Sequence, residues 1–174
     1  NTVSVPEVPT SKDSNQATPD VIEPAPTIEE AISEPSEYEV MRTNAIAKQN
    51  HAIQTRLEKV ISYTKQTMVA YMSEEDLNRL CTYVAEYSTG DTLQKISPVK
   101  VDSQLKSIDI MHFGWNIGKA FGKKRIHTAT FIKNVFAHTL RDLEIATIER
   151  KMSHTESECK IKLNYIFQQE MSMA

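Results

Sequence analysis

Residues 103–163 read SQLKSIDIMHFGWNIGKAFGKKRIHTATFIKNVFAHTLRDLEIATIERKMSHTESECKIKL, and the expected fold follows mainly from their pattern. It contains the only Trp and four of the five His of the 174-residue chain. Its apolar residues first recur at helical spacing and later alternate, which predicts three short helices followed by a strand, a turn and a strand. The fold class that we expect is therefore mainly α, with a small β-hairpin at the C-terminal end.

The first helix of this stretch is predicted to be the buried centre of the domain. Asp102 or Ser103 can cap its N-terminus. The apolar residues that follow form two rows: Leu105, Ile108, Met111 and Trp115, and Ile110, Phe113, Ile117 and Phe121. A helix that is apolar on so much of its circumference is typical of a core. Gly114 and Gly118 predict a closely packed neighbouring helix or a helix end, and His112 is interpreted as a core or rim histidine with satisfied hydrogen bonds.

Two further helices and a strand are predicted after this central helix. The next helix spans Thr128–Leu140, and Asp142 can cap another over Leu143–Met152. The start of the latter range also alternates between apolar and polar residues, so a strand remains an alternative there. Cys159–Leu163 alternates between apolar residues and two lysines, as a half-solvated strand does.

Composition divides the upstream half of the chain into a tail and a long helix. Residues 1–39 are rich in Pro, Glu, Ser and Thr, which predicts a disordered acidic linker. Residues 40–72 lack Gly and Pro and carry apolar residues three, four and seven apart, which predicts one long amphipathic helix. Ser73 can cap the next helix and Gly90 can end it, so residues 73–174 form the expected helical domain.

The long helix carries a heptad row of apolar residues, Ile46, Ile53 and Val60. The neighbouring row is polar: Gln49, Arg56 and Tyr63. A polar second row argues against a coiled coil, because both rows are apolar in such a seam. We expect the helix to pack against the chain's own domain, and a homodimer through this helix is the alternative.

Acidic and basic residues are distributed unevenly between the N-terminal tail and the rest of the chain. Residues 1–40 contain nine Asp and Glu against one Lys, while residues 41–174 contain 19 Lys and Arg against 14 Asp and Glu. The formal charge of −3 therefore combines a tail of −8 with a body of +5. A basic body of this kind is compatible with binding a polyanion such as nucleic acid.

The order of the predicted elements is that of a winged helix-turn-helix module that binds duplex DNA. The helix over 128–140 would cross the DNA backbone, and the helix over 142–152 would enter the major groove. Lysines of the final strand would bind phosphate. The expected DNA-binding residues are Lys123, Lys124, Arg125, Lys133, Thr147, Arg150, Lys151, Lys160 and Lys162.

We expect such a protein to be a transcriptional regulator or an accessory factor for the replication, partition or transfer of a mobile element. A helical adaptor that binds only protein is the alternative function. Its interface would be the long helix or the surface around Gly114 and Gly118.

Other function classes find little support in the sequence. His127 and His138, like His154 and Cys159, lack two further ligands at the spacing of a zinc site. No phosphate-binding or nucleophile motif occurs, so we expect no enzyme, metal, cofactor or small-molecule ligand. No apolar run approaches the length of a membrane span, so we expect no membrane partner. The two Cys lie far apart, which favours a reducing cytoplasm.

Overall fold

The computed structural model describes residues 33–156, 158–164 and 166. Within these residues the protein is mainly helical, as predicted, with five helices and no strand. Contacts divide the chain into two units, residues 1–36 and 37–174, and the five helices all belong to the second. Most of the linker predicted over residues 1–39 lies outside the described residues.

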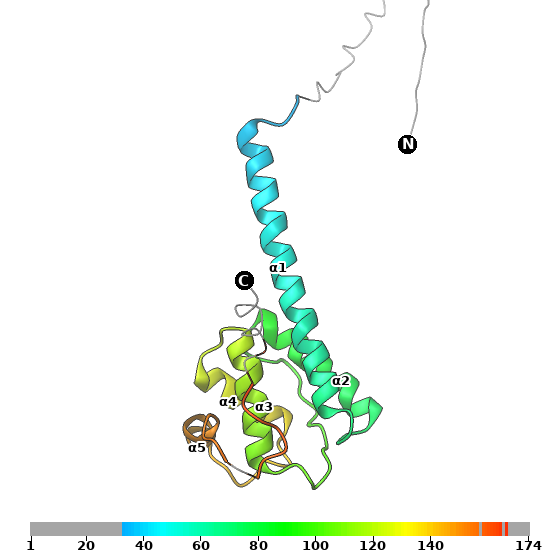
Figure 1. Ribbon diagram of the computed structural model, residues 1–174, viewed down its shortest axis with the longest axis vertical. Helices are drawn as coiled ribbons and strands as arrows, with labels where there is room; N and C mark the ends of the chain where they lie inside the picture. The colour runs from blue at the N-terminus through cyan, green and yellow to red at the C-terminus, as the bar shows by residue number, and fades with distance from the viewer. Residues whose placement is uncertain (1–32, 157, 165, 167–174) are drawn as a thin grey trace, which may run out of the picture. The chain divides into compact units, whose positions relative to one another are not determined.

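Two neighbouring helices, α1 and α2, open the second unit (Figure 1). α1 spans Glu37–Met68 and α2 spans Glu74–Thr89, so the long helix ends slightly before the predicted residue 72. The cap predicted for α2 is confirmed, because the Ser73 hydroxyl accepts a hydrogen bond from the Asp76 amide at 3.1 Å. α2 also ends where predicted, with Gly90 as its C-cap.

Helix α3, Ser107–Ala120, is the buried centre of this unit, as predicted. Eleven of its 14 residues are buried, and it packs against α1, α4 and α5. Its start differs from the prediction, because the helix begins after Lys106, whose amide donates to Oδ2 of Asp109 at 2.9 Å. Asp102 instead holds the preceding turn, where its carboxylate accepts a hydrogen bond from the Gln104 amide at 2.8 Å.

Two glycines allow α3 to lie very close to α4, which spans Arg125–Val135. A Cβ added at Gly118 would overlap the Thr128 hydroxyl and lie 2.9 Å from Cγ2 of the same residue. One added at Gly114 would lie 2.6 Å from Cγ2 of Ile132. Such distances are shorter than packed atoms tolerate, so only glycine permits this approach. The predicted close packing at this pair is confirmed.

Helix α4 ends earlier than predicted, and a long connection follows it. The helix stops at Val135 instead of residue 140, and residues 136–144 lead to α5, Ile145–Lys151. Residues 143–152 are therefore largely helical, and the alternative of a strand there is wrong. The short α5 is anchored by Ile148, which is fully buried, and by Met152 just after it.

The hairpin predicted at the C-terminal end is not formed in the part of this segment that the structure describes. Residues 158–164 form no strand. Their amides bond instead with side chains of α3: Asp109 accepts from Lys160 and Ile161, and Asn116 accepts from Asn164. Side chains of a helix thus form the hydrogen bonds to main-chain groups that a partner strand would otherwise have formed.

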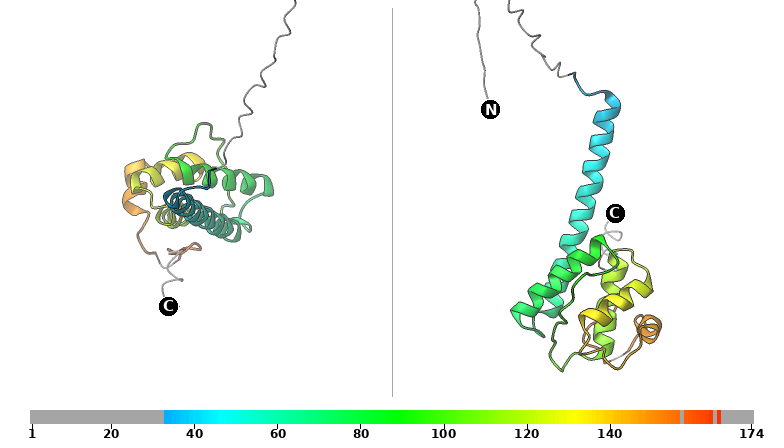
Figure 2. Two further views of the ribbon diagram at one scale, coloured as in Figure 1. Left: turned by 90° about the horizontal axis from the view of Figure 1, so that it is seen from above. Right: turned by 180° about the vertical axis from the view of Figure 1, so that it is seen from behind.

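The first half of α1 extends past the other helices of this unit (Figures 1 and 2). Residues 37–54 are all exposed, whereas Val60, Thr64 and Met68 are buried further along the same helix. The prediction that the long helix packs on its own domain is therefore confirmed only for its second half.

Candidate functional site

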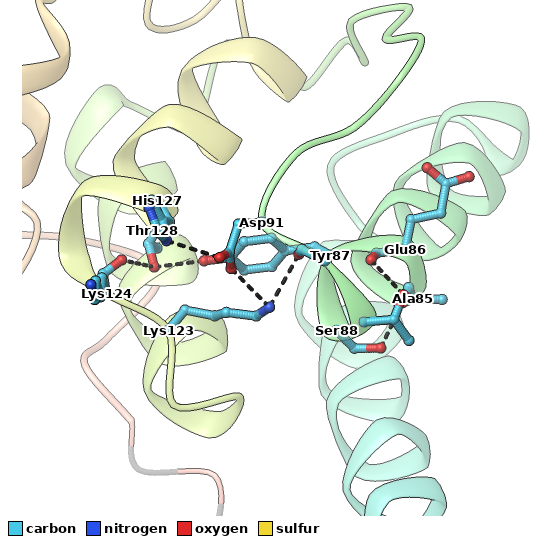
Figure 3. A network of polar contacts seen from close by, with 11 residues as sticks. Ala85, Glu86, Tyr87, Ser88, Asp91, Lys123, Lys124, His127 and Thr128 are labelled. Carbon is cyan, nitrogen blue, oxygen red and sulfur yellow. Dashed lines mark hydrogen bonds and ion pairs between the residues drawn. The ribbon is translucent and has the colours of Figure 1, made fainter.

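Lys123, one of the predicted DNA-binding residues, lies in an internal network of polar contacts (Figure 3). Its ammonium group is 3.1 Å from both the Gly90 carbonyl oxygen and Oδ1 of Asp91. It also lies over the Tyr87 ring, 5.1 Å from the centroid, and the side chain is only 14% exposed. This lysine joins the end of α2 to the start of α4 and is poorly placed to contact phosphate.

The same network fixes two groups next to Lys123. The hydrogen bond from Lys123 lowers the pKa of Asp91, and Nδ1 of His127 lies 3.3 Å from the other oxygen of that carboxylate. The Tyr87 hydroxyl shares a hydrogen bond of 2.8 Å with the Thr128 hydroxyl. Burial raises the pKa of Tyr87 to about 12. The buried part of the network is neutral, and its charges lie at the surface end.

Arg125 and Lys133 are also used inside the protein. The Arg125 guanidinium donates to the Ser153 hydroxyl at 3.0 Å and to the Glu149 carbonyl oxygen, which lies in α5. The Lys133 ammonium donates to three carbonyl oxygens of the connection between α4 and α5: Leu140, Arg141 and Leu143, at 2.8, 3.0 and 2.6 Å. Both cations hold α5 and its connection to α4 in place.

The other predicted DNA-binding residues fall into two groups. Thr147 is half-buried on α5, and the exposed cations are Lys124, Arg150, Lys151, Lys160 and Lys162. The Arg125 bond to Glu149 brings the start of α4 next to the end of α5, which places Lys124 and Arg150 in the same part of the surface. Lys160 and Lys162 lie on the segment that α3 holds.

Three buried polar side chains form a row on α3, and none of them is among the predicted site residues. Asp109, His112 and Asn116 are 2%, 1% and 0% exposed. Asn116 donates to the Lys162 carbonyl oxygen at 2.9 Å and to the Tyr63 hydroxyl of α1 at 2.7 Å, and its own carbonyl oxygen accepts from the Asn164 amide. The residues are three and four apart on an otherwise apolar helix, which is the signal that could have revealed them.

His112 is a core histidine with satisfied hydrogen bonds, as predicted. Its Nδ1 lies 2.7 Å from the Ile161 carbonyl oxygen, and its Nε2 lies 2.6 Å from the His154 carbonyl oxygen. The ring therefore ties both the turn after α5 and the C-terminal segment to α3. This contact explains how a segment without strand pairing is held on the core.

A second candidate surface is the apolar row on the exposed half of α1. Ile46 and Ile53 are 44% and 54% exposed, large values for isoleucine side chains. At about 100° per residue they lie on the same side of the helix as the buried residues Val60 and Thr64. The row that is buried on the domain therefore continues beyond it without cover.

Neither a metal-binding cluster nor a membrane-spanning helix is found among the described residues. No three His, Cys, Asp or Glu side chains among them gather closely enough to hold a metal ion. None of the described helices has both the length and the apolar character needed to cross a membrane. The chain matches no protein-family model, no curated protein and no solved structure.

Proposed function

We propose that this protein is a non-catalytic helical interaction module in which the first half of α1 pairs with the same segment of a second copy. The observation that carries the proposal is the uncovered continuation of the buried row, Ile46 and Ile53, along residues 37–54. Isolated helices of about this length are marginal in water, so a partner helix would stabilise the segment.

The position of the domain favours an antiparallel pair. The domain covers the row at Val60, Thr64 and Met68, on the same side of α1 as Ile46 and Ile53. In a parallel pair both domains would compete for the space between the two helices. In an antiparallel pair the domains lie at opposite ends, and each partner helix occupies the uncovered row of the other.

The charges along α1 are compatible with this orientation. The helix begins with Glu37 and Glu39, while residues 40–57 contain Arg42, Lys48 and Arg56 and no acidic residue. In an antiparallel pair the acidic start of one helix approaches the basic later part of the other. Opposite charges across such a seam favour the pairing and its orientation.

The expected pairing is weak. Burying the exposed parts of Ile46 and Ile53 in both copies contributes roughly 3–6 kcal/mol, since a whole isoleucine side chain contributes about 1.5–3 kcal/mol. Association costs about 4 kcal/mol or more in lost freedom of motion. Dimer formation should therefore depend strongly on protein concentration.

Sedimentation over a wide range of concentration tests this proposal. The wild-type chain should shift from monomer towards dimer as its concentration rises, and Ile46→Lys/Ile53→Lys should remain monomeric with an unchanged circular dichroism spectrum. Met41→Lys is the matched control, because Met41 is 64% exposed but lies about 140° around the helix from Ile46. A wild-type chain that is monomeric at every concentration would exclude the proposal.

Binding of duplex DNA is the second candidate function. Its support is the group of exposed cations around the end of α5, namely Lys124, Arg150 and Lys151. The helix-turn-helix form of the idea has weaker support, because nine residues, 136–144, separate α4 from α5. Three or four residues separate the helices of the DNA-binding motif. Binding through phosphate contacts is therefore favoured over reading of bases.

Binding to a duplex at two salt concentrations tests this second function. Affinity should fall steeply as salt rises, because each neutralised phosphate releases counterions. Arg150→Ala/Lys151→Ala should weaken binding and reduce the dependence on salt. The charge-matched control is Lys48→Ala/Lys95→Ala, which removes two exposed cations elsewhere. Equal effects of the two double variants, or no binding at low salt, would exclude a site at α5.

A further inference from the structure

A groove lies between the second half of α1 and the C-terminal segment that α3 holds. Tyr63 and Thr67 of α1, with Tyr71 in the turn that follows, line one side of the groove, and residues 160–164 line the other. The volume of the groove is about 360 Å³. Sites that bind small molecules have volumes of this order.

Hydrogen bonds from α3 fix both sides of the groove. The Asn116 side-chain amide donates to the Tyr63 hydroxyl at 2.7 Å and to the Lys162 carbonyl oxygen at 2.9 Å. The Asp109 carboxylate accepts hydrogen bonds from two main-chain amides of the same segment, at 2.6 and 3.0 Å. Because these bonds use main-chain groups of the segment, its side chains can be replaced without breaking them.

The polar side chains that line the groove suit a negatively charged ligand. None of the described lining residues is acidic, whereas Lys160 and Lys162 supply two ammonium groups. The Tyr63 hydroxyl accepts from Asn116, so its own proton can be donated to a ligand. Burial raises the pKa of Tyr63, and this hydroxyl therefore stays protonated at neutral pH. Positive charge and hydrogen-bond donors together favour a ligand with anionic oxygens.

Aromatic and apolar side chains form the rest of the lining. The rings of Tyr63 and Tyr71 belong to one side of the groove, and the half-buried Leu163 belongs to the other. The Tyr63 ring is also stacked on Phe113, with the ring centroids 6.0 Å apart and an angle of 13° between the planes, which holds it in one orientation. Aromatic rings pack favourably on one another, so a planar ring suits this lining.

We propose that the groove between α1 and residues 160–164 binds a small aromatic anion, a planar ring that carries a carboxylate or a phosphate group. The anionic group contacts the ammonium groups of Lys160 and Lys162, and the ring packs on the tyrosine side of the groove. No sequence motif marks this site, because its two sides are far apart in the chain. The site does not depend on pairing of α1, since Tyr63 lies in the half of the helix that packs on its own domain.

Titration of the full chain with small probes, followed by NMR, tests the site at a protein concentration where the chain is monomeric. Phenyl phosphate or benzoate should shift the amide signals of residues 160–164 in a saturable manner, and the tighter of the two identifies the anionic group. Benzyl alcohol has the ring without the charge and should bind about tenfold more weakly or less. Inorganic phosphate has the charge without the ring and should also bind more weakly.

The titration would overturn the proposal if neither aromatic anion gave saturable shifts. Binding of benzyl alcohol or of inorganic phosphate that is as tight as that of the aromatic anions would overturn it as well. The first result would show that the charge is not recognised, and the second that the groove does not recognise the ring.

Two charge-matched double variants locate the site. Lys160→Gln/Lys162→Gln should weaken binding of the aromatic anion about tenfold, because two contacts between opposite charges are lost. Lys124→Gln/Lys151→Gln removes two exposed cations near α5 and should bind the anion like the wild type. Equal losses in the two variants would show that net charge alone attracts the anion, which would overturn the proposed site.

Discussion

Helix α3 and the first half of α1 show opposite uses of a helix in one chain. Of the 14 residues of α3, eleven are buried, and each of its buried polar side chains binds main-chain groups of another segment. Residues 37–54 of α1 are all exposed, although Ile46 and Ile53 continue the row that is buried further along. The spacing of apolar residues thus shows which side of a helix is apolar. It does not show whether that side packs against the same chain or against another molecule.

Substitution of a buried polar residue of α3 should have the largest effect on stability. Asp109→Ala should lower the free energy of unfolding by about 3–5 kcal/mol, because the amides of Lys106, Lys160 and Ile161 lose their buried acceptor. Urea denaturation measures the change. Asp142→Ala is the control, since that side chain is 87% exposed, and it should change stability by less than about 0.5 kcal/mol. Similar losses in the two variants would show that the α3 row is not the anchor of the C-terminal segment.

Replacement of an isoleucine by alanine should also have different effects on stability in α3 and in α1. Ile110→Ala in α3 should cost about 2–5 kcal/mol, because Ile110 is fully buried and its loss leaves a cavity. Ile53→Ala in α1 should cost less than about 0.5 kcal/mol at concentrations where the chain is monomeric. Denaturation of both variants at low protein concentration gives the comparison. A cost at Ile53 near that at Ile110 would mean that the α1 row is already covered within one chain.

The close approach of α3 to α4 gives a smaller effect. Gly118→Ala should destabilise the protein by about 1–3 kcal/mol, because the added methyl group overlaps the Thr128 side chain and forces α4 outward. Gly90→Ala is the matched control, since its Cβ would meet only the Glu86 carbonyl oxygen, at 4.0 Å. Thermal unfolding of both variants checks the prediction, which fails if Gly118→Ala melts with the wild type.

The smallest effect concerns Tyr87 at high pH. An unfolded tyrosine loses its proton near pH 10, whereas folding raises the pKa of Tyr87 to about 12. The folded state then binds more protons than the unfolded state between these values, so stability falls as pH rises through this range. The contribution is intact below about pH 10. Tyr87→Phe should show a shallower fall in the urea midpoint above pH 10 than the wild type, and equal slopes would contradict the assignment.

Local signals in the sequence predicted much of the fold. The Ser73 cap, the apolar rows of the central helix and the Gly114–Gly118 pair each describe a short stretch and its immediate packing, and each is confirmed. Helix α4 ends five residues before the predicted residue 140, and the Lys133 ammonium binds carbonyl oxygens of the connection that follows. Such contacts depend on the path of the chain after the helix, which spacing does not describe.

Some of the predicted DNA-binding residues have partners that lie far away in the chain. Lys123 meets Asp91, 32 residues earlier, and Arg125 meets Ser153, 28 residues later. The sequence around a basic residue does not show whether a hydrogen-bond acceptor elsewhere in the chain will bind it. The hairpin is not formed among the described residues of this segment, where α3 holds the amides of Lys160 and Ile161 instead.

Distances between spin labels on two copies of α1 would show whether the helices pair and in which orientation. Single labels at Lys48 and at Thr55 would lie on the side of the helix away from Ile46, in a background with Cys81 and Cys159 replaced by Ser. An antiparallel pair centred near Ile46 predicts a longer distance at Thr55, by roughly 20 Å along the axis, than at Lys48. Equal distances at the two positions would indicate a parallel pair, and the absence of any intermolecular distance at high concentration would contradict pairing through α1.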